Sequence, residues 1–217
     1  MQLSGTREDH RRQILQVTTA EIDSRVAFFD DHAASWDRHG PGDTLQRLDE
    51  LKCRLGLQPG HEVLEVGCGT GQITDWVAKA VYQGRVVAID FSPAMLAQAL
   101  TRKVRAEFRL MDICRETATS ELFDTVLCLN AFPHFRDKPA ALRQIQRHLK
   151  PTGQLVVLHL AGSAQLNALH QRLPDPICRD LMPSIQEWPG LLSQASLQIT
   201  TFDDRADLFL LKARYAA

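Results

Sequence analysis

Residues 63–71 constrain the fold of this chain more than any other stretch. They read VLEVGCGTG, a short apolar run that passes directly into three glycines at alternate positions. A short apolar run ended by glycine is typical of a buried strand in a parallel sheet, and glycine lets the backbone turn sharply and approach a ligand closely. Residues 73–80 return to helical spacing. The pattern therefore predicts a strand, a tight loop and a helix, with the loop able to bind a ligand.

The same alternation continues along the chain. Apolar runs predict strands that follow the first one at residues 86–89, 108–111, 123–129, 155–160, 197–202 and 208–213. Helical spacing predicts helices at residues 92–99, 138–149, 165–173 and 184–195, and Ser92-Pro93 is a favourable helix start. Such alternation implies right-handed crossovers. We therefore predict an α/β fold with a doubly wound, mostly parallel seven-stranded sheet and an antiparallel C-terminal strand.

The first 44 residues are expected to form a tail and a helical lid. Residues 1–24 are polar and weakly periodic, which is typical of a frayed tail or an accessory helix. Phe28, Phe29 and Trp36 then give residues 24–36 an apolar side, which indicates a helix lying over the rest of the molecule. Leucines at three- and four-residue spacing predict another helix at residues 45–55. We treat residues 1–217 as a single domain that includes residues 1–44 as its tail and lid.

Charge and composition disfavour several classes of protein. The net charge is -1, so no strong basic field favours nucleic acid as a partner. No apolar stretch approaches the ~20 residues that span a bilayer, and the N-terminus lacks the apolar region of a secretory signal. The five cysteines form no CxxC pair, so we expect neither a disulfide framework nor a zinc cluster. We predict no metal site, although three histidines from separate elements could converge on one. These features predict a cytoplasmic protein.

The glycine loop alone leaves three interpretations: a plain tight corner, a dinucleotide site or a site for S-adenosylmethionine. Its Gly-x-Gly-x-Gly spacing does not match the pyrophosphate fingerprint Gly-x-Gly-x-x-Gly. Glu65 precedes the first glycine, where a carboxylate could meet an ammonium group. Asp90 lies nineteen residues past Gly71, at the end of the second strand, where a carboxylate can bind ribose hydroxyls. The glycine spacing and Glu65 favour S-adenosylmethionine over a dinucleotide, and Asp90 is placed to bind the ribose of the ligand.

Longer motifs strengthen this interpretation. VLEVGCGTG at residues 63–71 and VAIDFSPAML at residues 87–96 together resemble the class I S-adenosylmethionine-dependent methyltransferase superfamily. The likeness continues through LMDI at 110–113, FDTV at 123–126 and LKPTGQL at 149–155, and covers roughly residues 60–160. Within the superfamily, the chain most resembles the small-molecule branch that includes the ubiquinone and menaquinone C-methyltransferases. The resemblance implies a Rossmann-like methyltransferase fold with an N-terminal helical cap.

The resemblance also implies a set of cofactor-binding residues. The glycines line the methionine end of S-adenosylmethionine, Asp90 binds the ribose, and Asp112 accepts from the adenine amino group. Asp112 could instead cap a loop, Met95 could be a core residue and Asn130 a turn residue, and Cys68 is expected to be a packing residue rather than a nucleophile. The full implied set is Glu65, Gly67, Cys68, Gly69, Gly71, Asp90, Phe91, Met95, Asp112, Ile113, Asn130 and Ala131.

The acceptor of the methyl group is not specified by these motifs. A general base is needed only when the acceptor loses a proton, and His134, in the loop after the fourth strand, is the candidate. Trp36, His134, His159 and His170 are the candidate substrate-binding residues, although His159 could pack in the sheet and His170 could lie on a helix surface. Residues 161–187 are expected to carry acceptor specificity. We predict methyl transfer to a small molecule; the alternative is a non-catalytic S-adenosylmethionine-binding regulatory protein.

Overall fold

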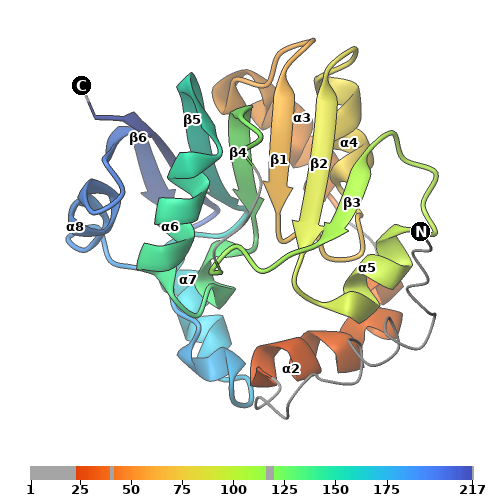
Figure 1. Cartoon of the computed structure of the whole chain (residues 1–217). Helices are drawn as coiled ribbons and strands as arrows, with labels where there is room; N and C mark the ends of the chain where they lie inside the picture. Colours follow the sequence, from red (N-terminus) through yellow and green to blue (C-terminus); the bar gives the residue numbers. More distant parts are fainter. Residues whose placement is uncertain (1–22, 40–41, 116–119, 217) are drawn as a thin grey trace, which may run out of the picture.

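The computed structural model describes residues 23–39, 42–115 and 120–216 (Figure 1). The tail expected within residues 1–22 lies outside the described residues. Within them, seven strands form one sheet in the order β3-β2-β1-β4-β5-β7-β6. The strands are β1 (Glu62–Val66), β2 (Arg85–Asp90), β3 (Glu107–Leu110), β4 (Phe123–Leu129), β5 (Leu149–His159), β6 (Leu197–Arg205) and β7 (Leu208–Tyr215).

The sheet confirms the doubly wound prediction. Strands β1 to β5 pair in parallel, whereas β7 is antiparallel to both β5 and β6. The strand order reverses on either side of β1, because β2 lies on one side of it and β4 on the other. Ligands of such sheets bind beyond the carboxyl ends of the strands at this switch point. In Figure 1 the arrowheads of β1, β2 and β4 point toward α2 (Ser24–His32).

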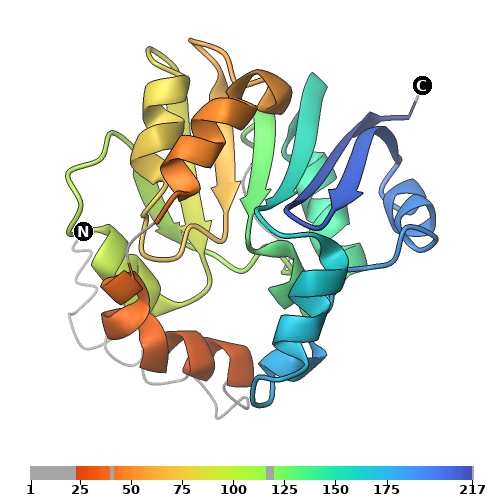
Figure 2. The same cartoon turned by 180° about the vertical axis from the view of Figure 1, so that it is seen from behind.

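Helices cover both faces of the sheet. Figures 1 and 2 show α3 (Thr44–Leu55) and α4 (Thr74–Ala80) on one face, and α6 (Lys138–Arg147) and α8 (Trp188–Ser193) on the other. Each face has its own apolar core, with Leu48 and Leu55 of α3 in one and Leu142 and Trp188 in the other. The remaining helical segments are η1 (Ala33–His39), α5 (Pro93–Ala99), η2 (Phe132–His134), α7 (Ser163–His170) and η3 (Ile177–Arg179).

Several element boundaries differ from those expected. β5 begins at Leu149 rather than residue 155, because Leu149 pairs with Phe123 and residues 150–153 form a bulge within the strand. α4 begins at Thr74, three residues past the last glycine of the loop. α8 is shorter than the predicted helix at 184–195. The predicted start of α5 is confirmed, since the Ser92 hydroxyl accepts from the Met95 amide at 3.1 Å.

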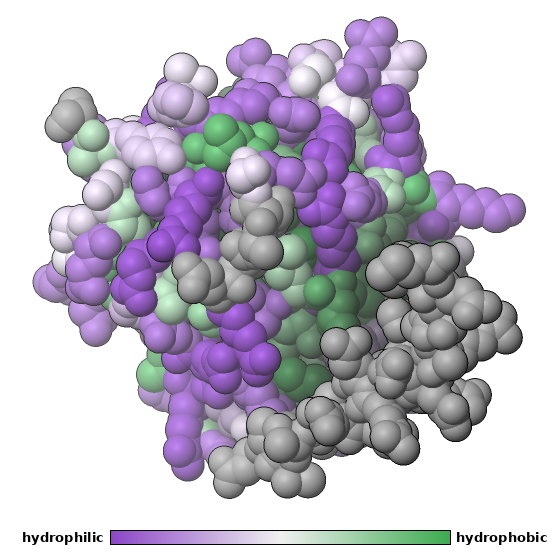
Figure 3. All heavy atoms as spheres, in the orientation of Figure 1, coloured by the Kyte–Doolittle hydropathy of each residue, from purple (hydrophilic) through white to green (hydrophobic). Residues whose placement is uncertain are grey.

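The face of the molecule seen in Figure 3 carries both polar and apolar residues. Figure 3 shows polar residues over most of the viewed face and apolar residues in a recess near its centre. Within residues 23–39, 42–115 and 120–216, no helix has the length and apolar character needed to cross a membrane.

Candidate functional site

The glycine loop after β1 is pressed against the loop after β4. Gly67 has a φ of 74°, in the left-handed region that residues with a Cβ rarely adopt. A Cβ added at Gly67 would lie only 2.5 Å from the Cβ of Ala131. The amides of Gly67 and Cys68 both donate to the Ile89 carbonyl, at 2.8 and 3.1 Å. The loop is therefore held between the ends of β2 and β4, and its first glycine has no room for a side chain.

Asp90 ties the end of β2 to this loop. Its carboxylate is buried, with one oxygen 2.7 Å from the Gly69 amide and the other 2.9 Å from the Ser92 amide. Burial raises the pKa of Asp90, although the hydrogen bonds from the Ser92 and Gly69 amides oppose the shift. Because a carboxylate oxygen accepts more than one hydrogen bond, Asp90 can still accept from a ligand on its cavity side.

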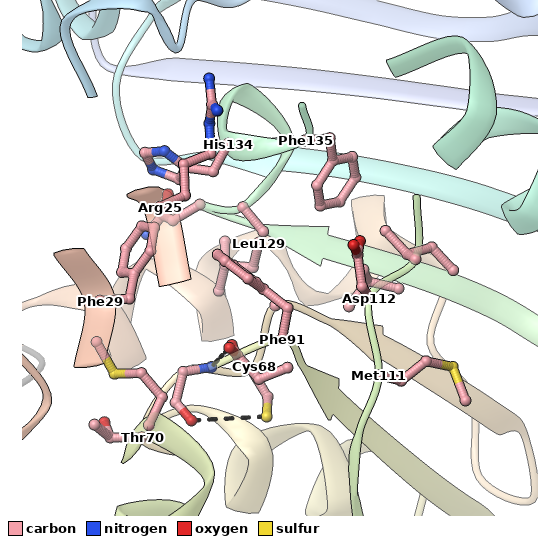
Figure 4. Close-up of a pocket in the computed structure, with 18 of the residues that line it drawn as sticks. Arg25, Phe29, Cys68, Thr70, Phe91, Met111, Asp112, Leu129, His134 and Phe135 are labelled. Atoms are coloured by element: carbon pink, nitrogen blue, oxygen red, sulfur yellow. Dashed lines mark hydrogen bonds between the residues drawn. The ribbon is translucent and has the colours of Figure 1, made fainter. Parts of the chain in front are cut away.

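One cavity brings most of the predicted site residues together. Figure 4 shows Phe29, Arg25 and His134 along one side of it and Asp112 and Met111 on the other. The sequence-predicted residues on its wall are Trp36, Gly67, Cys68, Gly69, Asp90, Phe91, Met95, Asp112, Ile113, Asn130, Ala131 and His134. They come from the N-terminal cap, which consists of α2 and η1, and from the carboxyl ends of four strands. They lie close together because the carboxyl ends of parallel strands are at the same edge of the sheet.

Asp112 and Met95 each combine a structural contact with a place on the cavity wall. One oxygen of Asp112 accepts from the Cys114 amide at 2.9 Å, which is the loop-capping role considered above. The other oxygen lies 3.5 Å from Arg136. Met95 is buried in a cluster with Phe29, and both also line the cavity. Asn130 adopts a left-handed φ of 54°, which is typical of asparagine in a turn.

Two of the predicted cofactor residues lie off the wall. Gly71 faces α5, where an added Cβ would lie 3.2 Å from the Cβ of Ala99. Glu65 is buried, and no hydrogen bond of ordinary geometry joins either carboxylate oxygen to a described residue. Burial raises the pKa of Glu65 to about 8. The Thr74 hydroxyl lowers this pKa, and the nearby charge of Asp90 raises it. The burial of Glu65 therefore favours its protonated form.

Cys68 is on the wall, in an environment that disfavours its thiolate form. Burial raises the pKa of its thiol far above neutral pH, and the nearby acids Glu65 and Asp90 raise it further. A nucleophilic cysteine requires the opposite shift. The expectation that Cys68 is a packing residue agrees with this environment.

Carboxylates fasten the N-terminal cap to the sheet. Asp30 of α2 accepts from the Ala94 amide at 3.1 Å at the start of α5. Asp37 of η1 accepts from the Thr70 hydroxyl at 2.6 Å in the glycine loop and pairs with Arg102. Phe29 of α2 contacts an aromatic group on each side, with ring centres 5.6 Å from both Trp36 and Phe91. Phe29 and Trp36, from the stretch expected to form a lid, therefore line the cavity.

The three candidate histidines are close together, but only His134 lines the cavity. Its ring centre is 5.0 Å from that of His170. His170 and His159 lie away from the cavity wall and are both buried. Burial lowers the pKa of His159 to about 3, and the neighbouring histidines lower it further. His159 is therefore a neutral ring that packs against Phe209, with ring centres 6.3 Å apart.

Some residues of the site carried no signal in the sequence. Asp180 is buried and contacts both His134 and Arg25, yet it lies between prolines in residues 161–187 and belongs to no motif. That segment contributes no residue to the cavity wall itself. Arg25 lies 155 residues from Asp180 in sequence. Arg136 also lines the cavity, and only its position two residues after His134 could have suggested it.

Comparisons with known proteins agree on one kind of domain. A family model described as "Methyltransferase domain" matches residues 63–153. The ubiquinone biosynthesis O-methyltransferase of Xanthomonas oryzae pv. oryzae is 36% identical over 174 residues, which cover 75% of this chain and 71% of that protein. The phosphoethanolamine N-methyltransferase of Triticum aestivum is 30% identical over 176 residues, which cover 76% of this chain and 34% of that protein. The chain thus spans about a third of the length of the plant relatives it matches.

Solved structures share the fold. The magnesium protoporphyrin IX methyltransferase of Synechocystis PCC 6803, solved with bound S-adenosylmethionine, superposes with a TM-score of 0.64. The match covers 91% of this chain and 100% of that one at 19% identity. At this identity the likeness concerns the arrangement of helices and strands and not the acceptor.

Proposed function

The chain belongs to the class I S-adenosylmethionine-dependent methyltransferase superfamily, and from this premise we propose that it transfers the methyl group of S-adenosylmethionine to a small-molecule acceptor. The observation that carries the proposal is the single cavity shared by the glycine loop, Asp90, Asp112 and the cap. We also propose that the protein acts in the cytoplasm, as its cysteine pattern favours.

The described residues fit the cofactor. Gly69 leaves open space on the cavity side, since an added Cβ would meet only the Trp36 indole nitrogen, at 4.0 Å. Asp90 would accept from the ribose hydroxyls, and the glycine loop with Asn130 and Ala131 would hold the methionine end. Glu65 lies two residues before that loop in sequence, and neither of its carboxyl oxygens has a hydrogen-bond partner among the described residues. These oxygens would reach the ammonium group of the cofactor through water or after a small shift.

The adenine would lie in the apolar part of the cavity. Phe91, Met95 and Ile113 supply flat or flexible apolar surface there, and Asp112 supplies an acceptor for the amino group. When bound, the cofactor supplies an activated methyl group on a positively charged sulfur. The chain has to exclude water and align the acceptor, and Phe29 and Trp36 of the cap perform the first of these tasks.

The acceptor would approach from the side of Phe29 and His134. Both line the cavity, and their ring centres are 5.0 Å apart. His134 is the candidate base, and Trp36 is a further candidate substrate contact. The relatives are named as an O-methyltransferase of ubiquinone biosynthesis and a phosphoethanolamine N-methyltransferase, so a hydroxyl or an amine of a small metabolite is the first class to test.

The test is a screen with methyl-labelled S-adenosylmethionine. The panel should contain phenols, amino alcohols and their phosphate esters, thiols, and proton-free acceptors such as thioethers and tertiary amines. The same acceptors are offered to His134→Gln, which should slow the reaction by ~10²–10⁴-fold if His134 accepts a proton. Binding of S-adenosylhomocysteine without transfer to any acceptor would favour the regulatory alternative, and absence of binding would refute both.

A further inference from the structure

Asp180 is the buried centre of a network that joins three distant segments. It follows η3, and its side chain is 1% exposed. One oxygen accepts from Nε and Nη2 of Arg25, at 2.8 and 2.6 Å. The other oxygen lies 2.9 Å from Nδ1 of His134. The cap, the loop after β4 and the segment after η3 therefore meet at one carboxyl group.

The charge state of Asp180 determines which nitrogen of His134 carries the hydrogen. Burial raises the pKa of Asp180, but the hydrogen bonds from His134 and Arg25 outweigh it and leave the pKa below its ordinary value. An ionised carboxylate can only accept, so Nδ1 of His134 must donate. Burial lowers the pKa of His134 more than Asp180 raises it. The ring is therefore neutral near pH 7, and Nε2 keeps its lone pair.

The packing around His134 fixes the plane of the ring. The ring of Phe29 meets it edge-on, with planes 78° apart, and the ring of His170 lies beside it at 31°. Lys138 donates to the Pro133 carbonyl at 2.9 Å and thereby braces the short η2 helix. Among the described residues no hydrogen bond involves Nε2 of His134. The ring lines the cavity, so Nε2 is the atom left to meet an acceptor.

The other titratable groups near the ring do not compete for Asp180. His170 donates from Nδ1 to the backbone carbonyl of Asp180, not to its carboxylate. His159 is neutral, and Lys138 bonds backbone carbonyls. Arg25 takes the second carboxylate oxygen, and this pairing keeps Asp180 ionised in spite of its burial.

Resting on the proposed function, we propose that Asp180 is a positioning residue that holds His134 with Nδ1 protonated and Nε2 toward the acceptor. The acceptor is then a hydroxyl or amine that gives up a proton on methylation. Its O–H or N–H bond breaks and the proton moves to Nε2. A lone pair on the acceptor oxygen or nitrogen forms the bond to the methyl carbon, and the electron pair of the broken O–H or N–H bond stays on that atom. The electron pair of the breaking carbon–sulfur bond stays on the sulfur. The Asp180 carboxylate balances the imidazolium charge.

The state of the ring can be measured without an acceptor. In ¹⁵N-histidine-labelled protein with S-adenosylhomocysteine at about pH 7, the wild type should show His134 protonated on Nδ1 and bare on Nε2. In Asp180→Asn, Arg25 will hold the amide oxygen and leave the NH₂ group facing His134. The proton of His134 should then move to Nε2. His170 is the matched internal control, because its partner is the unchanged backbone carbonyl at position 180.

An Nε2-protonated or charged His134 in the wild type would overturn the proposal, and this measurement stands even where Asp180→Asn fails to fold. An unchanged His134 tautomer in a folded Asp180→Asn would also overturn it. Methyl transfer confined to the thioethers and tertiary amines of the panel would contradict the acceptor class while leaving the proposed function intact. Absence of S-adenosylhomocysteine binding would refute the proposed function while the tautomer of the free protein still reports on Asp180.

Discussion

Gly67→Ala should lower both the stability of the fold and the affinity for the cofactor. A matched glycine substitution elsewhere can separate the two effects. The left-handed φ of 74° alone costs an L residue roughly 1–2 kcal/mol. The new Cβ would also lie 2.5 Å from the Ala131 Cβ, whereas ordinary contact begins at 3.4 Å. Overpacking of this kind costs typically ~1–3 kcal/mol. Together these effects should lower the free energy of unfolding by about 2–5 kcal/mol.

Gly60→Ala is the matched control for this substitution. Gly60 has a φ of 86°, but an added Cβ there would meet nothing within 4 Å. It should therefore lose only the roughly 1–2 kcal/mol of backbone strain. The variants are compared by urea unfolding and by calorimetric titration with S-adenosylhomocysteine.

The two glycines should differ most in cofactor affinity. To relieve the contact, the loop at Gly67 must move away from the loop after β4 by about 1 Å, which is enough to break a hydrogen bond to a ligand. Loss of one such bond, worth ~1.5 kcal/mol, weakens affinity by about tenfold. Gly60→Ala should bind like the wild type. Equal stability losses in the two variants, or wild-type affinity in Gly67→Ala, would refute the reasoning.

Two further predictions concern Glu65 and the cap. The pKa of Glu65 is raised to about 8 in the folded protein. The stability that comes from its proton is therefore fully present below its unfolded pKa of about 4.5 and is lost as pH rises through 8. Urea unfolding at pH 5 and 9 should show the wild type losing stability relative to Glu65→Gln, and parallel pH profiles of the two proteins would contradict this. Asp37→Ala should release η1 from the glycine loop, so trypsin should cut at Arg38 several-fold faster than in the wild type. Asp75→Ala, which removes an exposed pair with Lys79, should not change that rate, and equal rates in all three proteins would argue against the cap contact.

The alternation of strands and helices could be read from the sequence because it depends on local spacing. The apolar run at residues 63–66 and the Ser92-Pro93 start are local signals, and both elements formed as predicted. The start of β5 could not be read, because Leu149 joins the strand only by pairing with Phe123 across a bulge. A proline and a glycine in residues 150–153 predict a turn whether the chain forms a true turn there or a bulge within a strand.

The candidate site likewise contains residues that local sequence patterns predict and residues that only long-range contacts bring to it. Asp90 was predictable because its distance from the glycine loop reflects one crossover between neighbouring strands. Asp180 was not, because its partners Arg25 and His134 lie 155 and 46 residues away. The orientation of Gly71 toward α5 was also hidden, since the sequence gives the bend of a loop and not the direction in which each residue faces.

The central claim is that this cavity binds S-adenosylmethionine through Asp90. Asp90→Asn keeps the size of the side chain, but its amide offers only one acceptor for the Gly69 and Ser92 amides and no charge for the ribose. Asp124→Asn is the matched control, because Asp124 also accepts from a backbone amide, that of Glu62 at 2.8 Å, at the opposite end of the sheet.

Calorimetric titration of these three proteins with S-adenosylhomocysteine tests the claim most directly. Charge-assisted hydrogen bonds contribute ~1.5–3 kcal/mol each, so Asp90→Asn should bind at least about tenfold more weakly than the wild type. Asp124→Asn should bind with wild-type affinity. Equal affinity in the wild type and Asp90→Asn, or no binding by the folded wild type, would contradict the account.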